Sequence, residues 1–144
     1  MCVTSKNCTA ISLAPRRFLT TVSVLPHPGH FRKKEMKKFN LKDMKGGWFV
    51  GAFDPTAYSS NFEVGIHSHT KGEFHQDHFH KLGTEINLVL DGSVSINGTV
   101  FNKDDIFILY PYELSIVEYL TDVRICVVRN ISDTQDKYEV DIRQ

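Results

Sequence analysis

The residues best suited to chemistry are histidines gathered in one short stretch of the chain. Five of the seven histidines lie within residues 67–80, and a glutamate follows soon after the last of them. These residues are His67, His69, His75, His78, His80 and Glu85. Two imidazoles and a carboxylate that meet at one point form a three-ligand site for a divalent ion such as iron, manganese, nickel or zinc. Coordination positions left open at such an ion allow Lewis-acid chemistry or dioxygen binding.

Strand periodicity indicates how three of these groups come together. His78 and His80 are two positions apart, so on a strand both side chains project from the same face. Glu85 follows the turn at 81–84, on the next expected strand, where it can face the same space. The spacing therefore makes His78, His80 and Glu85 the candidate metal ligands.

The chain after residue 46 alternates short strand patterns with turn signals. Phe62, Val64 and Ile66 have the period of two that is typical of a half-buried strand. The dipeptide 97–98, Asn-Gly, is the strongest two-residue hairpin signal. Strands are expected at 48–53, 62–69, 78–80, 85–90, 93–96, 99–101, 105–109, 114–119 and 124–131. Because no window has a clear helical period, the pattern predicts an all-β sandwich or barrel.

One run of residues resembles the first conserved motif of the cupin superfamily. Gly72, His78, His80, Glu85 and Gly92 match that motif at each of its four intervals. The resemblance implies a single-domain cupin-type jelly-roll barrel with a metal or small-molecule site inside, held by the two histidines and the glutamate. It also implies a homodimer, since cupins commonly pair. The apolar residues on both faces of 86–90 likewise leave one face to be covered.

The second cupin motif is degenerate in this chain. That motif normally contains a proline, a second glycine and then a histidine that supplies a fourth metal ligand. Pro111 is kept here, but Tyr112 or Glu113 stands in place of the glycine. Ser115 or Ile116 stands in place of the histidine, and neither is a good ligand for a transition metal.

Three consequences of the missing histidine remain open. A three-ligand site can be completed by water, or His67 or His69 can supply the fourth bond if their face of the strand lines the interior. Alternatively no metal is bound, and the histidines recognise an organic ligand through hydrogen bonds and acid–base chemistry. We therefore expect His67, His69 and Glu113 as additional pocket residues.

These observations predict a small-molecule-binding cupin with a divalent metal. It would be a metal-dependent oxygenase or hydrolase acting on a small polar metabolite, with carbohydrate-derived compounds among the candidates. One alternative is a metal-independent sugar-nucleotide isomerase or epimerase, in which a histidine removes a proton next to a carbonyl. The other is a non-catalytic ligand-binding or regulatory module, so the sequence leaves open whether the protein is an enzyme.

Composition restricts the partners. The 144 residues contain 17 basic and 17 acidic side chains, and six of the basic ones lie in residues 1–34, which have no acidic residue. The rest of the chain is therefore acidic, which argues against nucleic acid and membrane surfaces as partners. No stretch approaches the roughly 18 apolar residues of a membrane helix. Three widely spread cysteines exclude a disulfide-dense scaffold.

Residues 1–36 are expected to lie outside the barrel, which is assigned to 37–144. A basic segment rich in serine and threonine is typical of an organelle transit peptide. A disordered tail, or translation that starts at Met36, explains the same composition. A start near Met36 predicts a cytoplasmic protein, whereas a transit peptide predicts one targeted to an organelle.

Overall fold

A computed structural model describes residues 36–142, which are mainly β-strand. Residues 37–144 group into one compact unit. The predicted leader lies, apart from Met36, outside the described residues, as do 143–144. No helix within the described range has the length and hydrophobicity needed to cross a bilayer.

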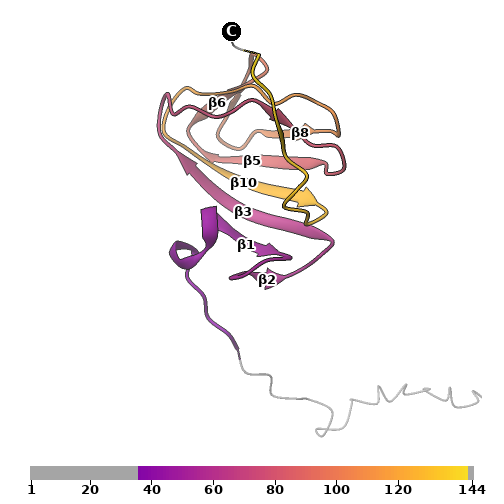
Figure 1. Cartoon of the computed structure of the whole chain (residues 1–144). Coiled ribbons are helices and arrows are strands. Elements are labelled where there is room, and N and C mark those ends of the chain that lie inside the picture. Colours follow the sequence, from indigo (N-terminus) through magenta and orange to yellow (C-terminus); the bar gives the residue numbers. More distant parts are fainter. Residues whose placement is uncertain (1–35, 143–144) are drawn as a thin grey trace, which may run out of the picture. The chain divides into compact units, whose positions relative to one another are not determined.

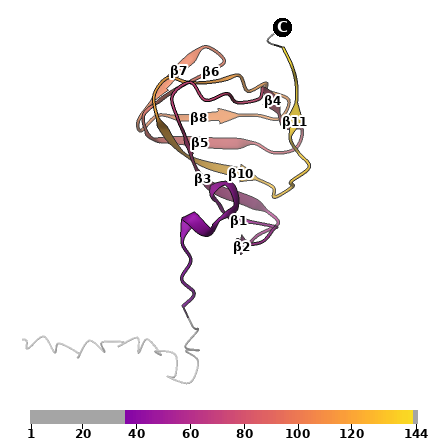
Figure 2. The same cartoon turned by 60° about the vertical axis from the view of Figure 1, so that its left-hand side comes forward.

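The described residues contain two short 3-10 turns and eleven strands (Figures 1 and 2). The turns η2 (Leu41–Asp43) and η3 (Lys45–Gly47) precede the first strand. The strands are β1 (Trp48–Gly51), β2 (Ala57–Tyr58), β3 (Phe62–His69), β4 (His78–Phe79), β5 (Glu85–Asp91), β6 (Ser93–Ile96), β7 (Thr99–Asn102), β8 (Ile106–Leu109), β9 (Val117–Tyr119), β10 (Val123–Asn130) and β11 (Tyr138–Glu139).

The strands form one large sheet and two small ones. The large sheet has the order β2-β1-β3-β10-β5-β8, and the small sheets are β7-β6-β9 and β11-β4. Strand β10 pairs antiparallel with both β3 and β5, so segments far apart in the sequence lie side by side (Figure 1). Such non-consecutive antiparallel neighbours are characteristic of a jelly roll. The predicted all-β jelly-roll barrel is confirmed.

The hydrophobic core joins the six-stranded sheet to the three-stranded sheet. Val89, Phe107 and Ile125 come from the large sheet and are at most 8% exposed. Val94 and Val117 come from β6 and β9 and belong to the same cluster. Every second side chain along β5, β8 and β10 therefore points inward. Polar residues at these alternate positions have their side chains in the interior as well.

Local turn chemistry sets the register of the smaller sheet. Asn97 and Gly98 connect β6 to β7 with positive φ angles of 51° and 80°, as a type I′ hairpin turn requires. The expected hairpin is therefore confirmed. The strand expected at 114–119 begins later, at Val117, because Ser115 makes an isolated bridge with His78 instead. Strands β2 and β11 were not expected, since two residues are too few to show a period.

Candidate functional site

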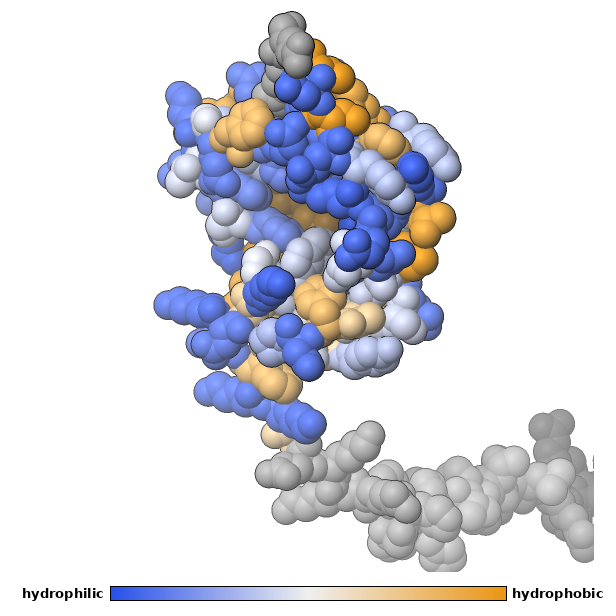
Figure 3. Space-filling model, viewed as in Figure 1, coloured by the Kyte–Doolittle hydropathy of each residue, from blue (hydrophilic) through white to orange (hydrophobic). Residues whose placement is uncertain are grey.

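A cavity of about 560 Å³ opens inside the fold, and all five clustered histidines line it. Its polar wall also includes Glu85 and Asn87 of β5, while its apolar floor includes Phe107, Leu109 and Val127. Figure 3 shows apolar surface set back between polar side chains near the middle of the molecule. A concave site with an apolar floor and a few convergent polar groups is typical of a small-molecule pocket.

The polar face of β3 is the face that lines this cavity. Glu63 is 1% exposed, and His67 and His69 also face the interior. Phe62, on the other face, is 43% exposed. His67 and His69 were expected in the pocket if their face of the strand lines the interior, and it does. The apolar residues of this strand point outward.

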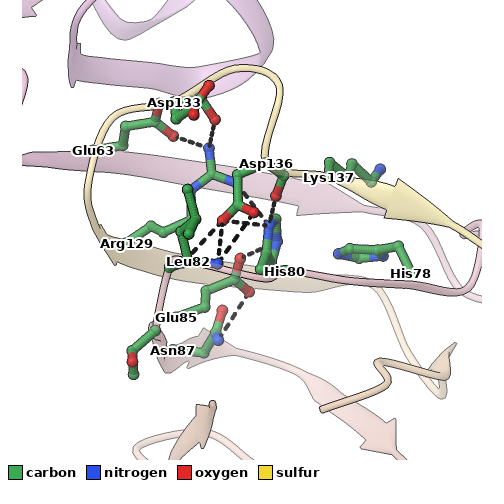
Figure 4. Close-up of polar contacts among 12 residues, drawn as sticks. Glu63, His78, His80, Leu82, Glu85, Asn87, Arg129, Asp133, Asp136 and Lys137 are labelled. Atoms are coloured by element: carbon green, nitrogen blue, oxygen red, sulfur yellow. Dashed lines mark hydrogen bonds and ion pairs between the residues drawn. The ribbon is translucent and has the colours of Figure 1, made fainter. Parts of the chain in front are cut away.

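His78, His80 and Glu85 all line the cavity, with His80 beside Glu85 and His78 on the other side of His80 (Figure 4). The rings of His78 and His80 have their centroids 5.3 Å apart, and both residues are at most 7% exposed. His80 Nε2 lies 3.5 Å from Glu85 Oε2. The second oxygen, Glu85 Oε1, accepts a hydrogen bond of 3.1 Å from Asn87 Nδ2. Burial opposes ionisation of Glu85, but the contacts with His80 and Asn87 outweigh it and lower the pKa of this carboxyl.

Backbone carbonyls fix the orientation of the two imidazoles. His78 Nδ1 lies 3.1 Å from the carbonyl oxygen of Gln76, and His80 Nδ1 contacts the carbonyl oxygen of Asp136. A carbonyl oxygen can only accept, so His78 Nδ1 carries the proton and its Nε2 presents a lone pair, as metal-binding histidines with this type of partner do. His80 Nδ1 lies between the Asp136 carbonyl, which accepts, and Arg129 Nη1, which donates, so these two contacts orient the ring without fixing its tautomer.

The contact between His80 and Glu85 can be bridged in two ways. With a proton on Nε2, His80 donates to Glu85, which agrees with the lowered pKa of this carboxyl. With Nε2 unprotonated, a metal ion bound to both atoms at about 2.0–2.2 Å would hold them about 3.0–3.4 Å apart, close to the 3.5 Å observed.

The donor atoms do not yet surround a single point. Within residues 36–142, no three His, Cys, Asp or Glu side chains are arranged so that they could hold a metal ion as they stand. The imidazole and carboxylate donors are nevertheless of the types that a divalent transition-metal ion prefers.

A buried ion pair supports this end of the cavity, and sequence reasoning missed it. Arg129 Nη2 donates to Glu63 Oε2 at 2.5 Å, and Ser132 donates to the other oxygen of Glu63 at 2.9 Å (Figure 4). Arg129 Nη1 lies 3.2 Å from His80 Nδ1, so its charge lies beside the ring. An available signal was the basic residue at an inward position of β10, in phase with Ile125 and Val127.

Asp136 holds the loop between β4 and β5. Its carboxylate accepts hydrogen bonds from the backbone N–H groups of Lys81 at 2.9 Å, Leu82 at 3.2 Å and Gly83 at 2.9 Å. Burial opposes its ionisation, but these three donors outweigh burial and lower the pKa of Asp136. The same residue fixes His80 through its backbone carbonyl, so one residue orients both the loop and the ring.

The remaining histidines also line the cavity. His69 Nδ1 pairs with Glu73 at 2.8 Å, and its ring stacks on Tyr119 with centroids 4.3 Å apart. His75 Nδ1 lies 3.3 Å from the hydroxyl of Tyr119. His67 packs edge-on against Trp48, and its Nε2 is buried without a hydrogen-bond partner.

Burial keeps several of these imidazoles neutral. It is the largest cause that lowers the pKa of His75 to about 4, and it also lowers the pKa values of His67 and His78. Lys137, on the wall of the same cavity, contributes to the shifts of His75 and His78 through its positive charge. Neutral imidazole is the form that binds a metal or accepts a proton.

The region of the second motif contributes Ser115 to the cavity. Ser115 is 3% exposed and lines the cavity next to His78, with which it forms a backbone bridge, so it occupies the place expected for the missing histidine. Glu113 differs from the expectation. It is exposed, does not line the cavity, and its carboxylate accepts the backbone N–H of Tyr110 at 3.0 Å.

Comparison with known proteins identifies the fold. A scan against protein-family models finds no match, and a search of curated proteins finds none either. A protein from Planctomyces limnophilus shares 17% sequence identity, with a TM-score of 0.52 over 72% of this chain and 96% of that one. A Klebsiella pneumoniae protein with a double-stranded β-helix domain shares 16%, with a TM-score of 0.54 over 74% and 99%.

The bacterial pirin YhhW from Escherichia coli, solved in complex with nickel(II), is a further structural neighbour. It shares 15% identity, with a TM-score of 0.50 over 60% of this chain and 39% of the pirin chain. Together with the sheet topology, these likenesses define the class. The chain has the double-stranded β-helix fold of the cupins, as its first motif predicts.

Proposed function

We propose that this protein is a metal-binding cupin that takes a small polar metabolite into its cavity. His78, His80 and Glu85 would hold a divalent ion through the two Nε2 atoms and the carboxylate. The observation that carries the proposal is the 3.5 Å between His80 Nε2 and Glu85 Oε2, with the ring of His78 beside that of His80, because a shared cation would bind both atoms. The nickel(II) in the related pirin fold supports the choice of a transition metal.

The other cavity residues have distinct tasks in this proposal. A bound divalent ion supplies Lewis acidity and activates water or polarises a substrate oxygen. The backbone carbonyl oxygens of Gln76 and Asp136 would orient the rings of His78 and His80 through their Nδ1 atoms. The apolar floor, including Phe107 and Val127, excludes water and leaves the polar part of a ligand to the histidine wall. Carbohydrate-derived ligands remain a prediction from the sequence.

Elemental analysis tests the proposal. The full chain is produced without a histidine tag in medium supplemented with iron, manganese, nickel and zinc, and its metal content is compared with that of a His78→Ala/His80→Ala variant. The parent is expected to retain close to one metal per chain, and the double variant close to none. His69→Ala is the matched control, because His69 lines the same cavity but is paired with Glu73. Equal metal in parent and double variant would contradict the proposed site.

A metal-free function is the second candidate, and two contacts favour it. A doubly protonated His80 also satisfies Glu85, and the pair His75–Tyr119 supplies a base and a hydroxyl within 3.3 Å. Such groups can move a proton next to a carbonyl, as in isomerisation or epimerisation. Absence of metal from the parent, together with solvent deuterium uptake by a keto sugar nucleotide, would replace the metal proposal with this one.

We also propose that the outer face of the large sheet pairs with a second copy of the chain. Two aliphatic rows cross this face, Val64–Val128–Ile86–Ile108 and Ile66–Cys126–Leu88–Ile106. The rows contain no charged residue, so a two-fold axis can bring the face onto itself without like charges meeting. Light scattering after gel filtration should give a dimer for the parent and a monomer for Ile86→Asp. A parent that stays monomeric at high concentration would refute the pairing.

A further inference from the structure

The C-terminal segment brings a lysine into the cavity wall, outside both cupin motifs. Strand β11 pairs antiparallel with β4 in the register that sets Tyr138 opposite Phe79. The rings of these two residues stack with centroids 5.4 Å apart, and neither ring lines the cavity. Because side chains alternate along a strand, Lys137 projects to the face of His78 and His80, and all three line the cavity.

The charge of Lys137 is available to a ligand. Within the part of the chain that the structure describes, its ion pair is with Glu139, at 3.5 Å between Nζ and Oε1. The two side chains are 40% and 60% exposed, so water screens this pair and it holds the lysine weakly. In Figure 4, Lys137 and His78 lie at the same end of the drawn cluster, and the lysine charge contributes to lowering the pKa values of His78 and His75.

The charged side chains of the cavity balance one another when the histidines are neutral and no metal is counted. Three basic and three acidic residues line it, namely Lys45, Arg129 and Lys137, and Asp54, Glu63 and Glu85. A divalent ion at the proposed site raises the sum to +2, and in the metal-free alternative a second proton on His80 raises it to +1. Both candidate functions therefore leave a surplus of positive charge, which an anionic ligand neutralises.

The surroundings of Lys137 fit a carboxylate. Arg129 is already engaged, because its Nη2 donates to Glu63 at 2.5 Å. A lysine ammonium binds an anion as a compact point charge, whereas phosphate dianions are typically bound at helix N-termini or backbone nests. Lys137 adjoins the start of a strand instead. The apolar floor, including Phe107 and Val127, suits the uncharged body of the same ligand.

We propose that the ligand of this cavity is a small carboxylate anion and that Lys137 binds its carboxylate. The inference deepens the proposed function and rests on it, since it requires a cavity that takes up a small polar metabolite. Glu139 holds the lysine when no ligand is bound, and the ligand carboxylate takes its place. Lys137 thereby selects charged metabolites over neutral ones of the same shape.

Benzoate and benzamide are suitable probes, because they share one shape and differ in charge. Full-length protein is titrated with each, and the shifts in its NMR spectrum give Kd. The parent should bind benzoate at least about tenfold more tightly than benzamide. Lys137→Met should weaken the binding of benzoate alone by about tenfold, whereas Lys137→Arg should keep most of the preference.

Two further variants isolate the position of the charge. Lys81→Met is the matched control, because Lys81 Nζ lies 3.8 Å from the ring centre of Tyr138 and the residue does not line the cavity. This variant loses the same charge and should bind benzoate as the parent does. Glu139→Gln removes the weak partner of Lys137 and should tighten benzoate binding by about twofold.

Measuring the metal content of each sample separates this inference from the metal proposal. Equal affinity for the two probes, no binding of benzoate, or equal losses in Lys137→Met and Lys81→Met would overturn the role of Lys137, even in a protein that retains its metal. A lysine-dependent preference for benzoate in a parent without metal would support the inference and overturn the metal proposal instead. Thermal unfolding of each variant establishes that it is folded.

Discussion

On the inner face of the large sheet, Arg129 of β10 lies opposite Glu63 of β3 and Glu85 of β5. One position away, on the outer face, Val128 lies opposite Val64 and Ile86. The charged row faces the cavity and the aliphatic row faces outward. This is the reverse of the usual arrangement, in which apolar side chains of an amphipathic strand point to the interior.

The two faces meet different physical requirements. Buried charges are tolerated only when they are paired and hydrogen-bonded, and the contacts of Arg129 with Glu63 meet that requirement. The outer row is only partly covered, with Ile86 and Ile108 more than 40% exposed. The proposed ligand cavity and the proposed dimer face therefore lie on opposite faces of the same four strands.

The largest loss of stability is expected when the ion pair between Arg129 and Glu63 on the inner face is removed. Arg129→Ala leaves the Glu63 carboxylate buried and unpaired, so the free energy of unfolding should fall by about 3–5 kcal/mol in chemical denaturation. Arg124→Ala is the matched control on the same strand, because Arg124 is exposed and should change stability by less than about 0.5 kcal/mol. Equal effects of the two substitutions would show that the inner ion pair contributes nothing.

A smaller loss of stability is expected when the backbone N–H groups of the loop after His80 lose the carboxylate that accepts their hydrogen bonds. Asp136→Ala removes a carboxylate that accepts three backbone N–H bonds, which should lower the free energy of unfolding by about 2–3 kcal/mol. Asp136→Asn keeps one acceptor oxygen and should lose about half as much. Hydrogen exchange of the amides of Lys81 and Gly83 should accelerate in both variants. Unchanged protection of these amides would contradict the role assigned to Asp136.

The smallest effect concerns the outer face. Cys126 lies in the middle of an aliphatic row, and burial raises the pKa of its thiol, so less of the reactive thiolate is present at pH 8. In a Cys2→Ser/Cys8→Ser background, iodoacetamide should modify Cys126 several-fold more slowly than a model peptide, as followed by mass spectrometry. Adding Ile86→Asp should speed the reaction if a second copy covers this face. A rate equal to that of the peptide would show that the face is open.

Several features could be predicted from local sequence because local geometry decides them. The Asn97-Gly98 turn requires positive φ angles that these two residues readily adopt, so it fixes a hairpin without help from the rest of the fold. The spacing of His78 and His80 places both on one face of a strand, and the turn at 81–84 brings Glu85 to the same space. All three residues line the cavity, and their role as metal ligands stays a prediction.

Other features depend on contacts between distant segments. A period of two divides β3 into two faces but does not say which one is inside, so the inward position of His67 and His69 follows only from the pairing of β3 with β1 and β10. His75 is outside any periodic element, so its place on the cavity wall depends on its contact with Tyr119 of β9, 44 positions away.

The sequence by itself determined an all-β cupin barrel and the three candidate ligands, because strand periodicity, turn residues and motif spacing are local properties of the chain. Only the tertiary structure decided what surrounds those ligands. Arg129 meets Glu63 across 66 positions and Asp136 meets His80 across 56, and such partners are chosen by sheet register and strand order. The physical reason is that strand pairing across the whole sheet decides which face of each strand is shielded from water. Only then is it settled whether a charged side chain is buried against a partner or exposed to solvent.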